Sequence, residues 1–125
     1  MSVNPVPTPN APPVAGPYSP AVRAGDWIVC AGQVGIDANG TLAEGVEAQT
    51  RQVFANIKAV LGDCGVTLND VAKATVFVTD IGAFATVNSV YAEAFGDHKP
   101  ARSTVQVAAL PARAEVEIEV WAYTA

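Results

Sequence analysis

Residues 46–79 read VEAQTRQVFANIKAVLGDCGVTLNDVAKATVFVT, and the spacing of their apolar residues changes once. In residues 46–64 apolar side chains recur every three or four positions, which predicts an amphipathic helix ending at Gly65. Residues 72–79 alternate and are rich in β-branched side chains, which predicts a strand. The apolar stripe of the helix consists of Val53, Ile57, Val60, Leu61 and Cys64. A helix followed directly by a strand predicts a mixed domain.

The flanking stretches extend this pattern in both directions. Residues 27–31 (WIVCA) form a short apolar run between turn residues, which predicts a buried strand with residues 18–23 as its hairpin partner. On the other side, Asp80 is a candidate N-cap for a helix that reaches about residue 95. Asn88 lies in the apolar stripe of that helix, so its amide needs a hydrogen-bond partner or a ligand.

The last third of the chain predicts a hairpin. Residues 102–109 and 115–123 both alternate, and the proline-containing segment 110–114 would be the turn between them. If the two apolar rows share one core, Arg102 and Glu117 project from the same opposite face of the sheet. This inference depends on register, because a slip of one residue would reverse the face.

The predicted element order is therefore β-β-α-β-α-β-β, an α+β fold in which two helices cover one face of a mixed sheet. The other face would carry a set of residues too aromatic for a wet surface and too polar for a core, which suggests that other subunits cover it. This set consists of Thr75, Phe77, Gln106, Glu117, Trp121 and Tyr123. We therefore expect a homo-oligomer.

Seven of the nine prolines fall within residues 5–20. Because proline removes a backbone donor and restricts φ, we expect residues 1–14 to be a flexible segment outside the fold. Residues 15–125 would then form a single domain.

Composition narrows the chemistry. A net charge of −5 argues against a nucleic-acid partner, and the single histidine, His98, cannot supply a catalytic triad or a multi-histidine metal site. We expect no metal and no cofactor. The two cysteines form no metal or redox motif, and no signal peptide or membrane-spanning run is visible, so we expect reduced thiols in a cytoplasmic protein without a membrane partner.

Two residues are candidates for chemistry. Arg102 follows Pro100-Ala101 at the start of a strand, and its planar guanidinium could hold a carboxylate through two hydrogen bonds. On sequence alone, an ordinary surface arginine is the alternative. Glu117 has Glu115 and Glu119 two residues away on either side, so repulsion could raise its pKa and suit it to proton transfer. A solvated strand face is the alternative.

Five short motifs in order resemble the RidA (YjgF) family. They are Gly16-Pro17-Tyr18-Ser19-Pro20, Cys30-Ala31-Gly32-Gln33, Thr75-Val76-Phe77-Val78-Thr79-Asp80, Pro100-Ala101-Arg102-Ser103 and Glu117-Ile118-Glu119. The resemblance implies a chorismate-mutase-like fold, a homotrimer with clefts between subunits, and deamination of enamine or imine acids such as 2-aminoacrylate to 2-keto acids and ammonia.

The resemblance also implies roles for individual residues. Arg102 would bind the carboxylate of a small substrate, and Glu117 would activate the hydrolytic water. The residues expected to contact the substrate beside them are Tyr18, Ala31, Gly32, Asn88, Tyr91 and Thr104. Ala31 replaces a serine found in many members, Lys99 often has a bulkier counterpart, and residues 96–100 are short, so the substrate range stays open.

Two other functions fit the same clefts. One is a non-enzymatic module that binds small carboxylates, and the other is a specialised deaminase of a catabolic pathway that acts on a longer enamine acid. Ribonuclease activity, attributed to some members, is the least favoured because the chain is acidic.

Overall fold

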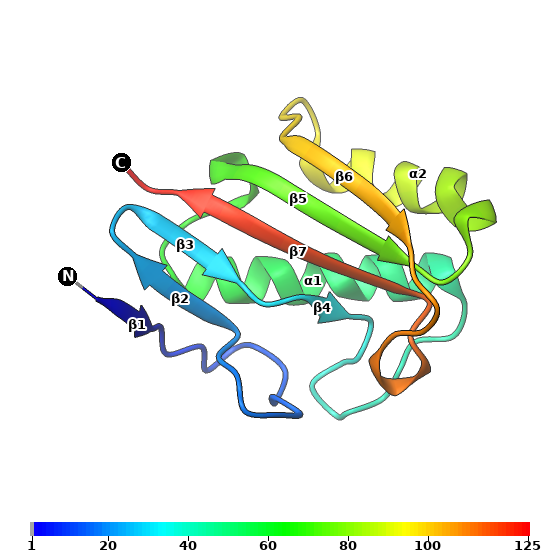
Figure 1. Ribbon diagram of the computed structural model, residues 1–125, viewed down its shortest axis with the longest axis horizontal. Coiled ribbons are helices and arrows are strands. Elements are labelled where there is room, and N and C mark those ends of the chain that lie inside the picture. The colour runs from blue at the N-terminus through cyan, green and yellow to red at the C-terminus, as the bar shows by residue number, and fades with distance from the viewer. Residues whose placement is uncertain (1) are drawn as a thin grey trace.

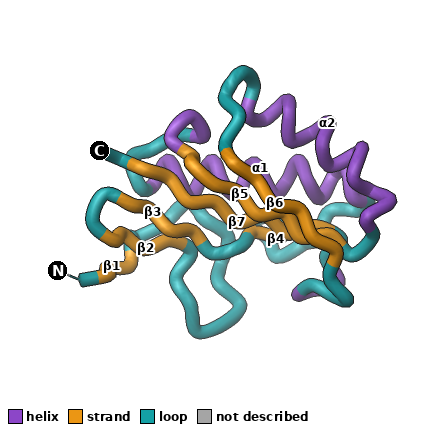
Figure 2. Tube along the Cα trace, turned by 45° about the horizontal axis from the view of Figure 1, so that its top comes forward, coloured by secondary structure: helices purple, strands orange, loops and turns teal. Residues whose placement is uncertain are grey.

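The computed structural model describes residues 2–125 and places helices on one side of a mixed sheet (Figures 1 and 2). The strands are β1 (Val3–Pro5), β2 (Ala21–Ala24), β3 (Trp27–Cys30), β4 (Gln33–Val34), β5 (Val71–Val78), β6 (Ala101–Gln106) and β7 (Val116–Tyr123). The helices are α1 (Val46–Asp63) and α2 (Phe84–Phe95), with short 3-10 turns at Leu68–Asp70, Ile81–Ala83 and Pro111–Arg113. The predicted α+β fold with two helices is confirmed.

Strand order explains why β7 is the central element. The sheet runs β1-β2-β3-β7-β5-β6, and β4 continues beside β7 where β3 ends. All pairings are antiparallel except β5 with β6, which are parallel. Because parallel neighbours need a crossover, α2 connects them as a β-α-β unit. Figure 1 shows β7 crossing the middle of the sheet.

The core lies between the helices and the sheet. The predicted stripe of α1 is buried, with Val53 and Leu61 at 0% exposure, and it packs toward Val116, Ile118 and Val120 of β7, which are also fully buried. Truncation of one such side chain, Leu61→Ala for example, costs about 2–5 kcal/mol of stability. Apolar packing therefore sets the position of α1 on the sheet.

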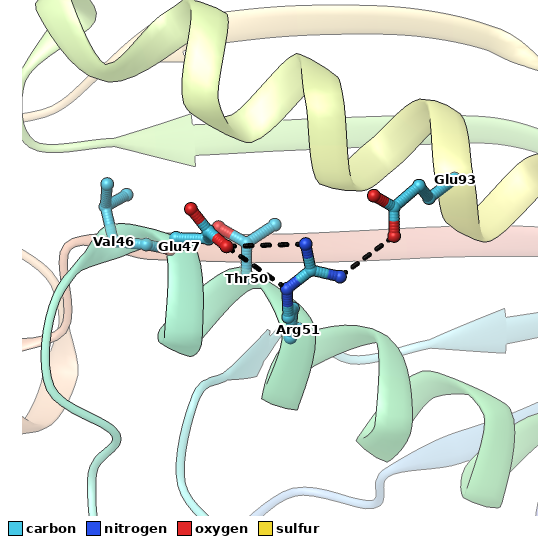
Figure 3. Close-up of polar contacts among 5 residues, drawn as sticks. All are labelled: Val46, Glu47, Thr50, Arg51 and Glu93. Atoms are coloured by element: carbon cyan, nitrogen blue, oxygen red, sulfur yellow. Dashed lines mark hydrogen bonds and ion pairs between the residues drawn. The ribbon is translucent and has the colours of Figure 1, made fainter.

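An ion-pair network links the outer surfaces of the two helices. Arg51 donates to Glu47 one turn earlier in α1 at 3.4 Å and to Glu93 of α2 at 2.9 Å (Figure 3). All three side chains are exposed, so solvent screens both pairs and each contributes little to stability. The network tethers α2 to α1 but does not determine the fold.

The predicted hairpin at the end of the chain is wrong. Strand β6 pairs with β5, and Arg102 lies opposite Ala74, whereas Glu117 of β7 lies opposite Phe77. Ala74 is fully buried under the helices, so Arg102 is on the helix side of the sheet and Glu117 is on the other side. Alternation showed that each strand has two faces, but it could not show which strand pairs with which.

Gln106, expected on the face covered by other subunits, lies on the opposite face because of the same strand pairing. Gln106 lies opposite the buried Val78, and its side-chain oxygen accepts a hydrogen bond from the backbone N–H of Ile81 at 2.8 Å. Gln106 therefore belongs to the helix side, where it anchors the chain just before α2.

The proline-rich segment is part of the structure rather than outside it. Strand β1 pairs with β2 at the sheet edge, and the backbone N–H of Val6 donates to Ala21 at 3.0 Å. The segment is extended over β1 and then turns, with the backbone N–H of Ala11 donating to Thr8 at 3.1 Å. Excluding residues 1–14 from the fold was therefore wrong for the edge strand, because a short strand needs only backbone hydrogen bonds from a neighbour and no hydrophobic pattern of its own.

Candidate functional site

Arg102 is held in one orientation by residues of α2. Its Nη1 donates to Oδ1 of Asn88 at 2.8 Å. Its guanidinium carbon lies 4.7 Å from the ring centroid of Tyr91 and 5.4 Å from that of Phe84. Stacking on aromatic faces favours a guanidinium over an ammonium group. The amide predicted to need a partner thus has one, and the remaining guanidinium N–H groups make no hydrogen bond with the described residues.

Two buried hydroxyl groups near Arg102 have no hydrogen-bond partner among the described residues. They belong to Tyr91 and to Thr104, which is two residues after Arg102 on β6. Burial raises the pKa of Tyr91, and the nearby charge of Arg102 opposes that rise. A buried hydroxyl without a partner is costly, and a ligand could satisfy it.

A cavity of about 330 Å³ opens beside this arginine. It is lined by Arg102, Asn88 and Tyr91 together with the loop that carries His98 and Lys99. One ring nitrogen of His98 is already engaged, because it lies 2.7 Å from a backbone carbonyl oxygen at the start of β5. This cavity therefore offers two cationic groups to an anionic ligand: Arg102, held by Asn88, and the exposed Lys99.

Glu117 occupies a separate cavity on the other side of the sheet. The cavity measures about 170 Å³, and Tyr18 and Gly32 line it with Glu117. A Cβ atom on Gly32 would lie 2.7 Å from the carboxyl carbon of Glu117, so only glycine permits this approach. Burial raises the pKa of Glu117, and the neighbouring charge of Glu119 raises it further. A carboxyl group with a raised pKa is suited to accept a proton and then return it.

The loop before β7 has an unusual backbone beside this cavity. Ala112, which lines it, has φ 57°, and Arg113 has φ 62°. Each non-glycine residue in this conformation costs about 1–2 kcal/mol, and such costs concentrate at functional sites. The strain indicates that the entry of the chain into β7, and hence the position of Glu117, is tightly specified.

Two buried amides of α1 bond to the backbone near the Glu117 cavity, one just after Gly32 and the other just before β7, and the sequence analysis missed both. Asn56 donates through Nδ2 to the carbonyl oxygens of Val34 at 3.0 Å and Ile36 at 2.9 Å. Gln49 accepts from the backbone N–H of Glu115 at 2.8 Å. Both amides are at most 4% exposed. Their polar character among the apolar residues of α1 was the available signal.

The structure brings the expected residues together as two groups. Arg102, Asn88 and Tyr91 form one, with Thr104 next along β6. The second group consists of Tyr18, Gly32 and Glu117, with Ala31 next to Gly32 and held through its N–H to Pro20 at 2.9 Å. Since the groups lie on opposite faces of the sheet, one chain does not place its own Arg102 and Glu117 in a common cavity.

The cysteines do not supply a nucleophile. Burial raises the pKa of Cys30 to about 12, with a smaller contribution from Cys64, and burial also raises the pKa of Cys64 itself. Thiolates, not thiols, are the nucleophilic form, so neither group is activated at neutral pH.

Among residues 2–125, neither helix has the length and apolar character needed to cross a membrane.

Comparison with known proteins assigns the family. The family model described as Endoribonuclease L-PSP matches residues 8–124. The chain belongs to this family. It is the RidA (YjgF) family to which the motifs pointed. A RutC family protein of Pyrococcus horikoshii is 50% identical over 118 residues, which cover 93% of this chain and 94% of the relative.

Two further RidA-family relatives bear on activity and fold. The 2-iminobutanoate/2-iminopropanoate deaminase of Salmonella typhimurium is 44% identical over 116 residues, covering 90% of this chain and 91% of the relative. The crystal structure of E. coli TdcF with bound serine superposes with a TM-score of 0.92 at 36% identity, covering 98% and 99% of the two chains. Imine deaminases are thus present among the relatives, alongside proteins with generic names.

Proposed function

We propose that this protein hydrolyses imines of small 2-amino acids, together with the enamines that tautomerise to them, to 2-keto acids and ammonia. The observation that carries the proposal is the guanidinium of Arg102, held by Asn88 and two aromatic rings with N–H groups left for a ligand. The named deaminase among the relatives supports the reaction.

The reaction needs Arg102, Glu117 and a water molecule. Arg102 binds the substrate carboxylate through two hydrogen bonds, which fixes the imine carbon relative to the protein. Glu117 takes a proton from water as the oxygen attacks that carbon, and returns it to the nitrogen. Glu117 then takes the hydroxyl proton of the resulting amino alcohol and delivers it to the amino nitrogen. As the C=O bond forms, the C–N bond breaks, releasing ammonia and a 2-keto acid.

The positions of the two cavities support an oligomer. Because Arg102 and Glu117 project from opposite faces of one sheet, a substrate can reach both only if they come from different subunits. A homotrimer with clefts between subunits, as expected for the family, would meet this requirement. Trp121 and Tyr123 on the open face are 44% and 45% exposed in the single chain and would be covered by such assembly.

A complementation experiment tests activity and assembly together. 2-Aminoacrylate is generated in situ by a serine dehydratase, and its loss is followed with wild type, Arg102→Ala and Glu117→Gln. Each variant alone should be inactive. Mixed by co-expression, a site with both groups intact forms at about one quarter of the subunit interfaces, so activity should return to roughly that fraction.

Each outcome is informative. No acceleration by the wild type would refute the deaminase for this substrate, and carboxylate binding without turnover would favour the binding module. Inactive mixtures, with both variants folded and assembled, would contradict a site shared between subunits. An RNA substrate, which the family description names, is not favoured because the net charge of −5 opposes phosphate binding.

A further inference from the structure

The proline-rich segment forms one wall of the cavity that contains Glu117. Pro12, Pro13, Val14 and Ala15 line this cavity together with Tyr18 and Glu117. These residues present no side-chain donor or acceptor except the tyrosine hydroxyl. A substrate side chain that reaches this wall therefore meets an apolar surface.

A side-chain latch fixes the wall to α1. The backbone N–H of Asn10 donates to Oδ2 of Asp63 at 2.9 Å, and its Nδ2 donates to Oδ1 of the same carboxylate at 2.6 Å. Asp63 is the last residue of α1, so the wall is tied to a rigid element. On the far side, the carbonyl oxygen of Pro20 accepts from Ala31 at 2.9 Å.

The segment between these anchors has little conformational freedom. Pro12, Pro13 and Pro17 fix φ at three of the positions between Asn10 and Pro20. A chain that is restrained at both ends and stiffened by proline cannot yield to a larger ligand at low cost.

We propose that residues 12–15 set the size limit for the substrate side chain, and that the Asn10–Asp63 latch holds them in place. The inference rests on the proposed function for the identity of the ligand. A volume of about 170 Å³ lies below the roughly 300–1,000 Å³ typical of pockets for drug-sized ligands. A fixed wall in a cavity of this size favours a short substrate side chain over a branched or aromatic one.

Opening the latch should relax this limit. In Asn10→Asp two carboxylates face each other, so both contacts are lost by repulsion. The matched control is the double variant Asn10→Asp/Asp63→Asn, in which the amide and the carboxylate exchange places. The amide at the end of α1 then donates to the carboxylate on the proline-rich segment, and its oxygen accepts the backbone N–H of position 10, which restores the latch. Both positions are exposed, so folding should be retained.

The measurement is selectivity between short and branched ligands. Imines of alanine and leucine are generated by an L-amino-acid oxidase, and kcat/KM is determined for each. Binding of pyruvate and 4-methyl-2-oxopentanoate is titrated calorimetrically in parallel. The single variant should shift both short-to-branched ratios toward the branched ligand by about tenfold or more, and the double variant should return them to the wild-type values.

The two readouts separate the wall from the reaction. One outcome is that imines resist hydrolysis while the 2-keto acid ratio shifts in the single variant and is restored in the double variant. That result would support the size limit set by residues 12–15 and refute the deaminase activity. If imines are hydrolysed and Asn10→Asp leaves both selectivity ratios unchanged, the size limit set by residues 12–15 is refuted and the deaminase activity is supported. Failure of both 2-keto acids to bind any of the three proteins also overturns the wall, because the cavity then has no ligand of this class.

Discussion

Substituting single glycines by alanine separates the candidate site from the fold. In Gly32→Ala the new Cβ would lie 2.7 Å from the carboxyl carbon of Glu117 and 3.0 Å from Oε1. Ordinary contacts begin near 3.4 Å, so the carboxyl group must withdraw by about 0.7 Å. The obstructing atoms are at the end of a flexible side chain, which can rotate.

The expected effect of Gly32→Ala is therefore on activity. A displacement of about 1 Å in a catalytic group can cost about a hundredfold in rate, so we expect kcat to fall by roughly 10- to 100-fold. The free energy of unfolding should fall by only about 1 kcal/mol, the lower end for overpacking. Imine loss and urea unfolding measure the two quantities.

Two other glycines provide controls of opposite sign. In Gly35→Ala the Cβ would lie 2.6 Å from Cα and 2.7 Å from the carbonyl oxygen of Gln49. Backbone cannot rotate away, so stability should fall by about 3 kcal/mol. Gly62 lies in α1 with nothing within 4 Å of a new Cβ, so Gly62→Ala should add about 0.5–1 kcal/mol. A Gly32→Ala protein with wild-type kcat would remove Glu117 from the mechanism.

Four further predictions concern polar groups of the site. Glu119→Gln removes a charge that raises the pKa of Glu117, so the acidic limb of the kcat/KM profile should move to lower pH; an unmoved limb would assign it to another group. The raised pKa also means that ionised Glu117 opposes folding. Glu117→Gln should therefore be more stable than wild type at neutral pH, with the difference vanishing below the ordinary glutamate pKa of 4.5, and equal urea midpoints at all pH values would contradict this. Asn56→Leu leaves two carbonyl groups without their hydrogen-bond donor and should lower the free energy of unfolding, measured in urea, by about 2–4 kcal/mol. A smaller decrease would mean that water replaces the amide. Asn88→Ala frees Arg102 and should lower kcat/KM by about 10- to 100-fold, whereas an unchanged value would show that the arginine needs no such partner.

Local pattern was sufficient for the individual elements. The stripe of α1 and the alternation of β5 are present as expected. Asp80 caps the 3-10 turn Ile81–Ala83, where its Oδ1 accepts from the N–H of Gly82 at 2.8 Å, and not α2 itself, whose N-cap is Ala83. Each depends on residues within a few positions of one another, and helical or strand periodicity expresses that directly. The need of Asn88 for a partner also followed from its position in an apolar stripe.

Features that join distant parts of the chain could not be predicted from local sequence patterns. The pairing of β6 with β5 rather than β7 places Arg102 and Glu117 on opposite faces, and no property of either strand alone distinguishes the two arrangements. The same holds for the Asn10–Asp63 latch, whose residues are 53 positions apart. Two exposed polar side chains have many equally plausible partners before the chain is folded.

What the sequence by itself determined was both helices and five of the seven strands, the family motifs and the identity of the chemical groups. Only the tertiary structure decided that these groups lie on opposite faces of the sheet, that Gly32 makes room for Glu117, and that residues 12–15 line the cavity of Glu117. The physical reason is that side-chain identity and periodicity are local properties. A site is a meeting of distant segments, and strand pairing and packing choose which ones meet.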